Sequence, residues 1–271
     1  MAEVVSRDGT CIVFERAGAG PAVILVDGAL GSSALGSNQR LSALLDRSLT
    51  VVTYNRRGRP PSGDAAEYAV AREVDDIEAL ATAVGGTAGL YGLSSGAALV
   101  LEAGLRLGGE SVTRTALYEA PWNDDPGAQD AWLAYTRRLG ELLAEGRRGD
   151  AVALFLSFAG ATDEVVAGTR RSPLWPALEA VARTLAYDAA VLGPHNTVPV
   201  ERAGGLRVPA LVMNGGAGAA FMRESAVTLS RAIPDARYLE LAGQRHDVDP
   251  AALVPPLTEF FLQSGAAGRA A

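Results

Sequence analysis

Leu90-Tyr91-Gly92-Leu93-Ser94-Ser95-Gly96 is the stretch that decides how this chain folds. Ala88 to Leu93 is typical of a short strand, and the apolar run Ala97 to Leu101 follows with no spacer. A Gly-x-Ser-x-Gly sequence between a strand and a helix predicts a nucleophile elbow, a strained turn that lifts the central serine hydroxyl above a parallel sheet. The helix behind Ser94 adds free N–H groups and the positive end of its dipole beside that hydroxyl.

The composition limits what kind of protein this is. The 271 residues, 48% of them hydrophobic, suffice for one large α/β domain or two smaller ones. No segment approaches the ~20 uninterrupted apolar residues of a membrane helix. The first residues lack a secretory signal, and a single cysteine, Cys11, suits a reducing compartment. We therefore expect a cytoplasmic protein.

Missing residue types exclude several chemistries. The chain has no lysine, which rules out Schiff-base catalysis and a phosphate-loop lysine. With two histidines and one cysteine, no metal site is expected. The net charge of −7 argues against a nucleic-acid or membrane surface. We expect a small-molecule substrate and no cofactor, and the sequence leaves open a monomer or a homodimer.

Strands and helices alternate along the first 120 residues. Asp8-Gly9 is a strong hairpin signal between short strands. Alternation of strands and helices implies right-handed crossovers and a mainly parallel sheet. The expected strands are 3–5, 10–14, 22–26, 50–54, 88–93 and 113–119, and the expected helices are 39–46 and 72–84.

The pattern changes between Pro121 and about Leu206. We interpret residues 121–206 as a helical cap inserted into an α/β core of residues 1–120 and 207–264, with a flexible tail at 265–271. The large apolar groups of the cap suit a mostly apolar pocket, with Trp122 and Trp132 as expected substrate contacts. The expected helices of the cap are 129–145, 150–158, 162–171 and 175–192, and the core resumes with strands 210–213 and 238–241 and helices 221–233 and 251–261.

Asp27-Gly28, Arg56-Arg57-Gly58, the Ser94 turn and His246 together resemble the α/β-hydrolase superfamily. The likeness covers nearly the whole chain and is strongest to single-chain, helical-capped esterases and hydrolases of secondary metabolism. It implies an α/β-hydrolase fold, with a mainly parallel central sheet, an N-terminal antiparallel hairpin and an inserted helical cap. The arginine-bearing turn after residues 50–54 is expected to hold loops together.

The same resemblance implies roles for individual residues. Ser94 occupies the position of the family's nucleophile, and His246, in the loop after the last strand, occupies the position of its general base. The serine precedes the histidine, as in these hydrolases. Backbone N–H groups of Ala29 and Ser95 would form the oxyanion hole. His195 is expected to be an ordinary residue of a cap loop.

Two positions depart from the family pattern. Asp27-Gly28 replaces the usual His-Gly of the oxyanion turn. Asp27 either binds a polar substrate group or fixes the loop by accepting backbone N–H bonds, and we favour the structural role. Gly218 stands where many relatives carry the aspartate that orients the histidine.

Glu119 is the carboxylate that we expect to replace that aspartate. It ends the strand next to the Ser94 strand, on the same rim of the sheet, and some relatives take their acid from that strand end. The other acids are less suitable: Asp125 and Asp249 precede prolines as helix caps, Asp247 adjoins His246 in sequence, and Asp124 is kept in reserve.

The sequence thus favours a serine hydrolase. Such an enzyme would cleave a carboxylic ester, lactone or thioester of a small, mostly apolar molecule through an acyl-enzyme. Two alternatives stay open: a non-hydrolytic acid–base enzyme catalysing a cyclisation or elimination, and a non-enzymatic module that binds a small ligand. Loss of the usual aspartate favours the binding module, whereas retention of Ser94 and His246 favours an enzyme.

Overall fold

A central sheet of eight strands runs through the part of the chain that the computed structural model describes, residues 1–36 and 38–263. The strand order is β1-β2-β4-β3-β5-β6-β7-β8. β1 (Ala2–Val5) and β2 (Cys11–Ala17) form the expected antiparallel hairpin, β2 pairs antiparallel with β4, and every later pairing is parallel. The tail expected at 265–271 lies outside the described residues. The remaining strands are β3 (Ala22–Val26), β4 (Thr50–Tyr54), β5 (Ala88–Leu93), β6 (Val112–Tyr118), β7 (Ala210–Gly215) and β8 (Ala236–Leu241).

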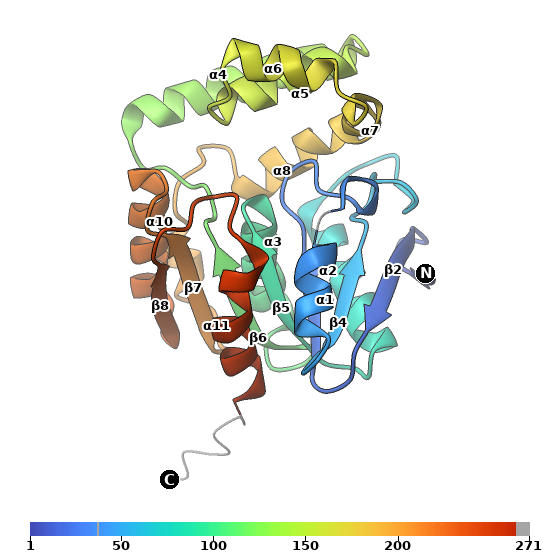
Figure 1. Ribbon diagram of the computed structural model, residues 1–271, viewed down its shortest axis with the longest axis vertical. Helices are drawn as coiled ribbons and strands as arrows, with labels where there is room; N and C mark the ends of the chain where they lie inside the picture. Colours follow the sequence, from blue (N-terminus) through green and yellow to red (C-terminus); the bar gives the residue numbers. More distant parts are fainter. Residues whose placement is uncertain (37, 264–271) are drawn as a thin grey trace.

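Helices cover both faces of this sheet, which is why the inner strands are apolar on both sides. On one face, α1 (Gln39–Leu45) and α11 (Pro250–Leu262) pack against Leu25 and Val51 of the inner strands. The opposite face is covered by α2 (Val70–Ala83), α3 (Ser95–Leu107) and α10 (Ala220–Ala232). Figure 1 shows α1 and α11 on the near side of the sheet. The mainly parallel α/β fold expected from the sequence is therefore confirmed.

Helices also fill the chain between β6 and β7, as expected for an inserted cap. In Figure 1, α4, α5 and α6 form a layer beyond the edge at which the parallel strands end. We propose residues 121–206 as the limits of this cap. No helix in the described ranges is long and apolar enough to cross a membrane. The cap contains α4 (Pro126–Ala144), α5 (Arg148–Phe158), α6 (Asp163–Arg170), α7 (Trp175–Val181), α8 (Leu185–Leu192) and α9 (Val200–Ala203).

The single helix expected over 175–192 is wrong, because it is interrupted between α7 and α8. A 3-10 turn, η2 (Ala182–Thr184), separates the two. The Thr184 hydroxyl donates to Val181 O at 2.8 Å and accepts from Arg59 Nε at 3.3 Å. A threonine hydroxyl that binds a carbonyl of the preceding turn bends a helix. The break lets α8 run back towards the sheet.

Candidate active site

Ser94 occupies a sharp turn between β5 and α3. Its backbone has φ 58° and ψ −129°, a conformation that residues other than glycine rarely adopt. The Ser94 N–H donates to Tyr118 O at the end of the neighbouring strand, at 2.9 Å. A Cβ at Gly92 would overlap Gly96 O, and one at Gly96 would overlap Val26 O. The two glycines therefore permit a strained backbone of the kind found at functional sites.

His246 lies in the loop that follows β8, with its side chain 46% exposed. The loop is held against the ends of two neighbouring strands. The Tyr118 hydroxyl donates to Arg245 O at 2.6 Å, and the Ala217 N–H donates to Gln244 O at 2.9 Å. A Cβ at Gly215 would overlap Gln244 O, so the loop contacts the end of β7 directly.

Glu119 meets the His246 ring, and the two partners are 127 positions apart in the chain. Its Oε2 lies 2.8 Å from His246 Nδ1, and its Oε1 accepts the Gly215 N–H at 2.8 Å. Glu119 follows β6 directly and has φ 46°. A carboxylate at Nδ1 holds the proton on that nitrogen and leaves Nε2 as a proton acceptor. Ser94 and the Glu119–His246 pair thus share the rim at which β5 and β6 end.

Gly218 explains why the glutamate that follows β6 fits here. A Cβ at Gly218 would lie 3.0 Å from Glu119 Oε1. The Glu119 carboxylate therefore occupies the space beside the position at which many relatives carry the aspartate. The other acids have separate contacts: Asp125 and Asp249 cap α4 and α11, and Asp124 accepts the Val198 N–H at 3.0 Å.

The turn after β3 passes close to the serine. A Cβ at Gly28 would lie 2.9 Å from Leu93 O and 3.7 Å from Ser94 Oγ. Leu30, one residue beyond Ala29, has φ 60°. Ser95 is the first residue of α3, so its N–H has no acceptor within the helix. The turn and the start of α3 are the two segments expected to supply the oxyanion donors.

Asp27 is buried beside this turn. Its Oδ1 accepts a hydrogen bond from Asn38 Nδ2 at 2.6 Å, a side-chain partner in place of the expected backbone N–H groups. Burial raises the pKa of Asp27 to about 6, and nearby Arg59 and Arg56 offset part of that rise. The contact with Asn38 supports the loop-fixing role, while a contact with substrate stays a prediction.

Three buried arginines follow β4 and hold loops together, as expected. Arg57 pairs with Asp76 of α2 through two hydrogen bonds of 2.7 and 2.8 Å and with Asp8 of the hairpin at 2.8 Å. Arg56 binds Glu73 of α2 through two bonds of 2.7 Å. Such two-point pairs fix both position and orientation. The contacts of Arg59, the third of these arginines, lie nearer the Ser94 turn.

Asp188, on α8, joins the arginine cluster and was missed from the sequence. Its carboxylate accepts from Arg56 Nη1 at 2.7 Å, Arg59 Nη2 at 3.1 Å and Ser95 Oγ at 2.8 Å. One signal was available, because Asp188 is the only charged residue in the otherwise apolar run 185–192. A lone acid in such a run is costly to bury unless it is paired.

Trp122 and Trp132 are buried where the cap meets the end of α8. The Trp122 indole N–H donates to Leu192 O at 3.2 Å, and that of Trp132 donates to Gly193 O at 3.0 Å. These contacts join the start of the cap to the C-terminal end of α8. Whether either ring contacts substrate stays a prediction. His195 lies exposed in the loop beyond α8, as expected for a cap residue.

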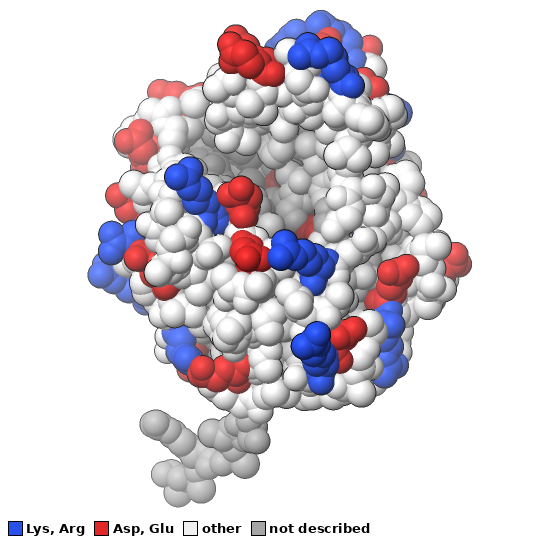
Figure 2. All heavy atoms as spheres, in the orientation of Figure 1, with Lys and Arg blue, Asp and Glu red and all other residues white. Residues whose placement is uncertain are grey.

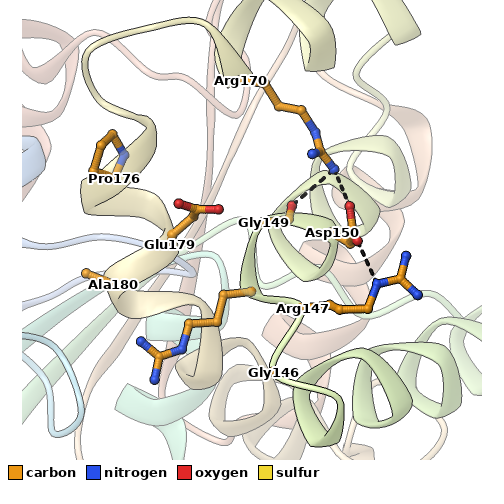
Figure 3. Close-up of a pocket in the computed structure, with 9 residues that line it drawn as sticks. Gly146, Arg147, Gly149, Asp150, Arg170, Pro176, Glu179 and Ala180 are labelled. Atoms are coloured by element: carbon orange, nitrogen blue, oxygen red, sulfur yellow. Dashed lines mark hydrogen bonds and ion pairs between the residues drawn. The ribbon is translucent and has the colours of Figure 1, made fainter.

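Figure 2 shows the face of the molecule hollowed between the cap and the core, with acidic and basic groups along the rim. A separate open cavity of about 590 Å³ lies in the cap, between α5, α6 and α7 (Figure 3). Asp150 there accepts from Arg147 at 2.7 Å and Arg170 at 2.6 Å, so these charges are already paired. No group of three or more potential metal ligands comes together among residues 1–36 and 38–263.

The family model described as the alpha/beta hydrolase family matches residues 23–255. An alpha/beta hydrolase from Sphaerobacter thermophilus is 45% identical, with 96% of this chain and 100% of that chain covered and a TM-score of 0.84. A thermophilic esterase from Thermogutta terrifontis is 21% identical, with 96% and 95% covered and a TM-score of 0.68. An enol-lactonase from Burkholderia xenovorans is 22% identical, with 96% of each chain covered and a TM-score of 0.63.

At 21% and 22% identity, the last two likenesses show the fold alone. A comparison with curated proteins returns no match. The family model spans most of this chain. The whole length of the Sphaerobacter chain aligns with 96% of this chain. Both support a hydrolase, and the chain belongs to the alpha/beta hydrolase family.

Proposed function

We propose that this protein is a serine hydrolase that cleaves a carboxylic ester, lactone or thioester of a small, mostly apolar molecule through an acyl-enzyme. The observation that carries the proposal is the 2.8 Å contact between Glu119 Oε2 and His246 Nδ1, on the rim that also bears Ser94. A buried carboxylate at Nδ1 is the arrangement that makes a histidine a general base towards a serine hydroxyl.

In the proposed reaction, His246 Nε2 takes the Ser94 proton while Ser94 Oγ attacks the substrate carbonyl. The N–H groups of Ala29 and Ser95 stabilise the oxyanion that forms. The leaving alkoxide or thiolate takes the proton from His246, and the acyl group stays on Ser94. His246 then deprotonates a water molecule, which attacks the acyl-enzyme, releases the acid and restores the serine.

Strain at Ser94 favours this function over the two alternatives. A cyclising or eliminating enzyme that uses only acid–base chemistry does not need a serine held at φ 58°. A binding module needs neither that strain nor a carboxylate placed at Nδ1. Backbone strain of this kind persists where a site depends on it.

A fluorophosphonate probe tests the proposal, because it phosphonylates an activated serine. We expect the wild-type chain to be labelled and to release p-nitrophenol from p-nitrophenyl butyrate with a burst. Ser94→Ala should lose both properties, and His246→Ala should lose nearly all activity. His195→Ala, which removes an exposed histidine, is the matched control and should behave as wild type. An unlabelled wild-type chain, or full turnover by Ser94→Ala, would refute the serine mechanism.

A further inference from the structure

The Asp188 carboxylate lies between the cap and the Ser94 turn. It belongs to α8, it is 4% exposed, and three side chains from the core donate hydrogen bonds to it. Ser95 Oγ donates to Oδ1 at 2.8 Å, and Arg56 Nη1 donates to the same oxygen at 2.7 Å. Arg59 Nη2 lies 3.1 Å from both oxygens. Buried charge with several partners is expected to have little freedom to move.

Arg56 and Arg59, which bind Asp188, also bind the turn after β3. Arg59 Nη1 donates to Gly28 O at 2.7 Å and to Gly31 O at 2.8 Å. Arg56 Nη1, besides binding Asp188, donates to Asp27 O at 3.1 Å. Arg56 and Arg59 thus bind carbonyl oxygens of the turn as well as the Asp188 carboxylate. The other edge of Arg56 is held by Glu73, so this guanidinium cannot rotate away.

These contacts link the two segments that are expected to supply the oxyanion donors. Ser95 directly follows Ser94 at the start of α3, and Gly28 directly precedes Ala29 in the turn after β3. The turn and the start of α3 are 64 or more positions apart in sequence, counted from Gly31 to Ser95. In the described residues, the Asp188 carboxylate binds one segment directly and the other through Arg59. Asp188 and Arg59 therefore form a bridge between the two segments that contain Ala29 and Ser95.

We propose that Asp188 is a positioning residue that sets the spacing of the oxyanion hole from the cap side. The inference rests on the proposed serine hydrolase function and adds a residue to it. Oxyanion donors act on charge that develops in the transition state, so a wrong spacing should lower kcat and leave KM nearly unchanged. Loss of a whole donor costs ~10²–10³ in rate, and a displaced donor should cost about tenfold.

Ser95→Ala is the sharpest variant, because it removes one hydrogen bond to Asp188 and keeps the Ser95 N–H. We expect kcat for p-nitrophenyl butyrate to fall about tenfold, with KM and thermal stability nearly unchanged. Inhibition by n-butylboronic acid, whose serine adduct is tetrahedral, should weaken by about the same factor. Thr50→Val is the control, since it deletes a buried hydroxyl that donates to Gly20 O at 2.9 Å at the start of β4, the end of the strand away from the site.

Asp188→Asn and the double variant with Ser95→Ala complete the test. If the two residues act together, Ser95→Ala should change kcat less in the Asp188→Asn background than in wild type. If the effects of Ser95→Ala and Asp188→Asn on kcat are independent, or if Ser95→Ala leaves kcat unchanged, the inference about Asp188 is overturned, and the proposed function is not affected. A loss of kcat that merely tracks a fall in melting temperature overturns the same inference. A wild-type chain that neither reacts with fluorophosphonate nor hydrolyses the ester overturns the proposed function, and this inference with it.

Discussion

Replacing Asp27 with asparagine should stabilise the folded protein above pH 6 and change little near pH 4. Burial raises the pKa of this carboxyl from its ordinary value of 3.8 to about 6, although Arg59, Arg56 and the Asn38 amide each lower it. Between those values the folded chain holds a proton that the unfolded chain has lost, so stability declines as the pH rises through this window. The full difference is about 3 kcal/mol, since one pH unit corresponds to roughly 1.4 kcal/mol.

Asparagine suits the test because it has the shape of the acid, no charge, and an oxygen for the Asn38 amide. Urea unfolding of both proteins between pH 4 and pH 8.5 gives the free energy of unfolding. The variant should gain about 3 kcal/mol at the alkaline end, or roughly 6 °C in Tm, and almost nothing at the acid end.

Asp130→Asn is the matched control, because it changes net charge equally at an exposed position of α4. Its stability difference from wild type should not follow the pH window of Asp27. If Asp27→Asn is less stable at pH 8, or differs from wild type by a constant amount, then the arginines outweigh burial and the reasoning fails.

Three further results are expected. Glu119→Gln should lower kcat for p-nitrophenyl butyrate by up to about 10⁴-fold with KM little changed, because the amide no longer favours the reactive tautomer of His246; retention of a tenth of the activity would contradict this. Gly218→Asp in a Glu119→Ala background should recover at least about tenfold of the lost kcat, because the Cβ of the new aspartate lies 3.0 Å from the present Glu119 Oε1 position, whereas an unimproved double variant would refute the exchange. Phe260→Ala, at a side chain 2% exposed, should cost about 3–5 kcal/mol in urea unfolding, while Leu262→Ala, 45% exposed on the same helix, should cost under about 1 kcal/mol; equal losses would contradict this packing.

Much of the sheet could be predicted because its signals are local. The unbroken apolar run Ala22–Val26 predicted β3 with its bounds, since a strand covered on both faces does not alternate with polar residues, and the bounds expected for β4 and β5 also match. Asp125 and Asp249 were expected as the caps of α4 and α11 because each directly precedes a proline, which is again a local signal. The break before α8 was missed because Arg59, the partner of Thr184, comes 125 positions earlier.

Of the proposed catalytic residues, one could be identified from local sequence, whereas the partner of the histidine depends on contacts between distant segments. Ser94 was identifiable from sequence because the steric demands of its turn fall on neighbouring glycines. For the histidine's partner the sequence offered several carboxylates, with Glu119 preferred. The contact itself depends on how β6, β7 and the loop after β8 meet, and on the space that Gly218 leaves.

By itself, then, the sequence determined the order of strands and helices, the serine turn and the family, because each rests on short local patterns and on their order along the chain. Only the tertiary structure decided which acid faces His246 and that Asp188 reaches Ser95, 93 positions away. Those pairings depend on distances between separate segments, and packing of the whole chain sets such distances.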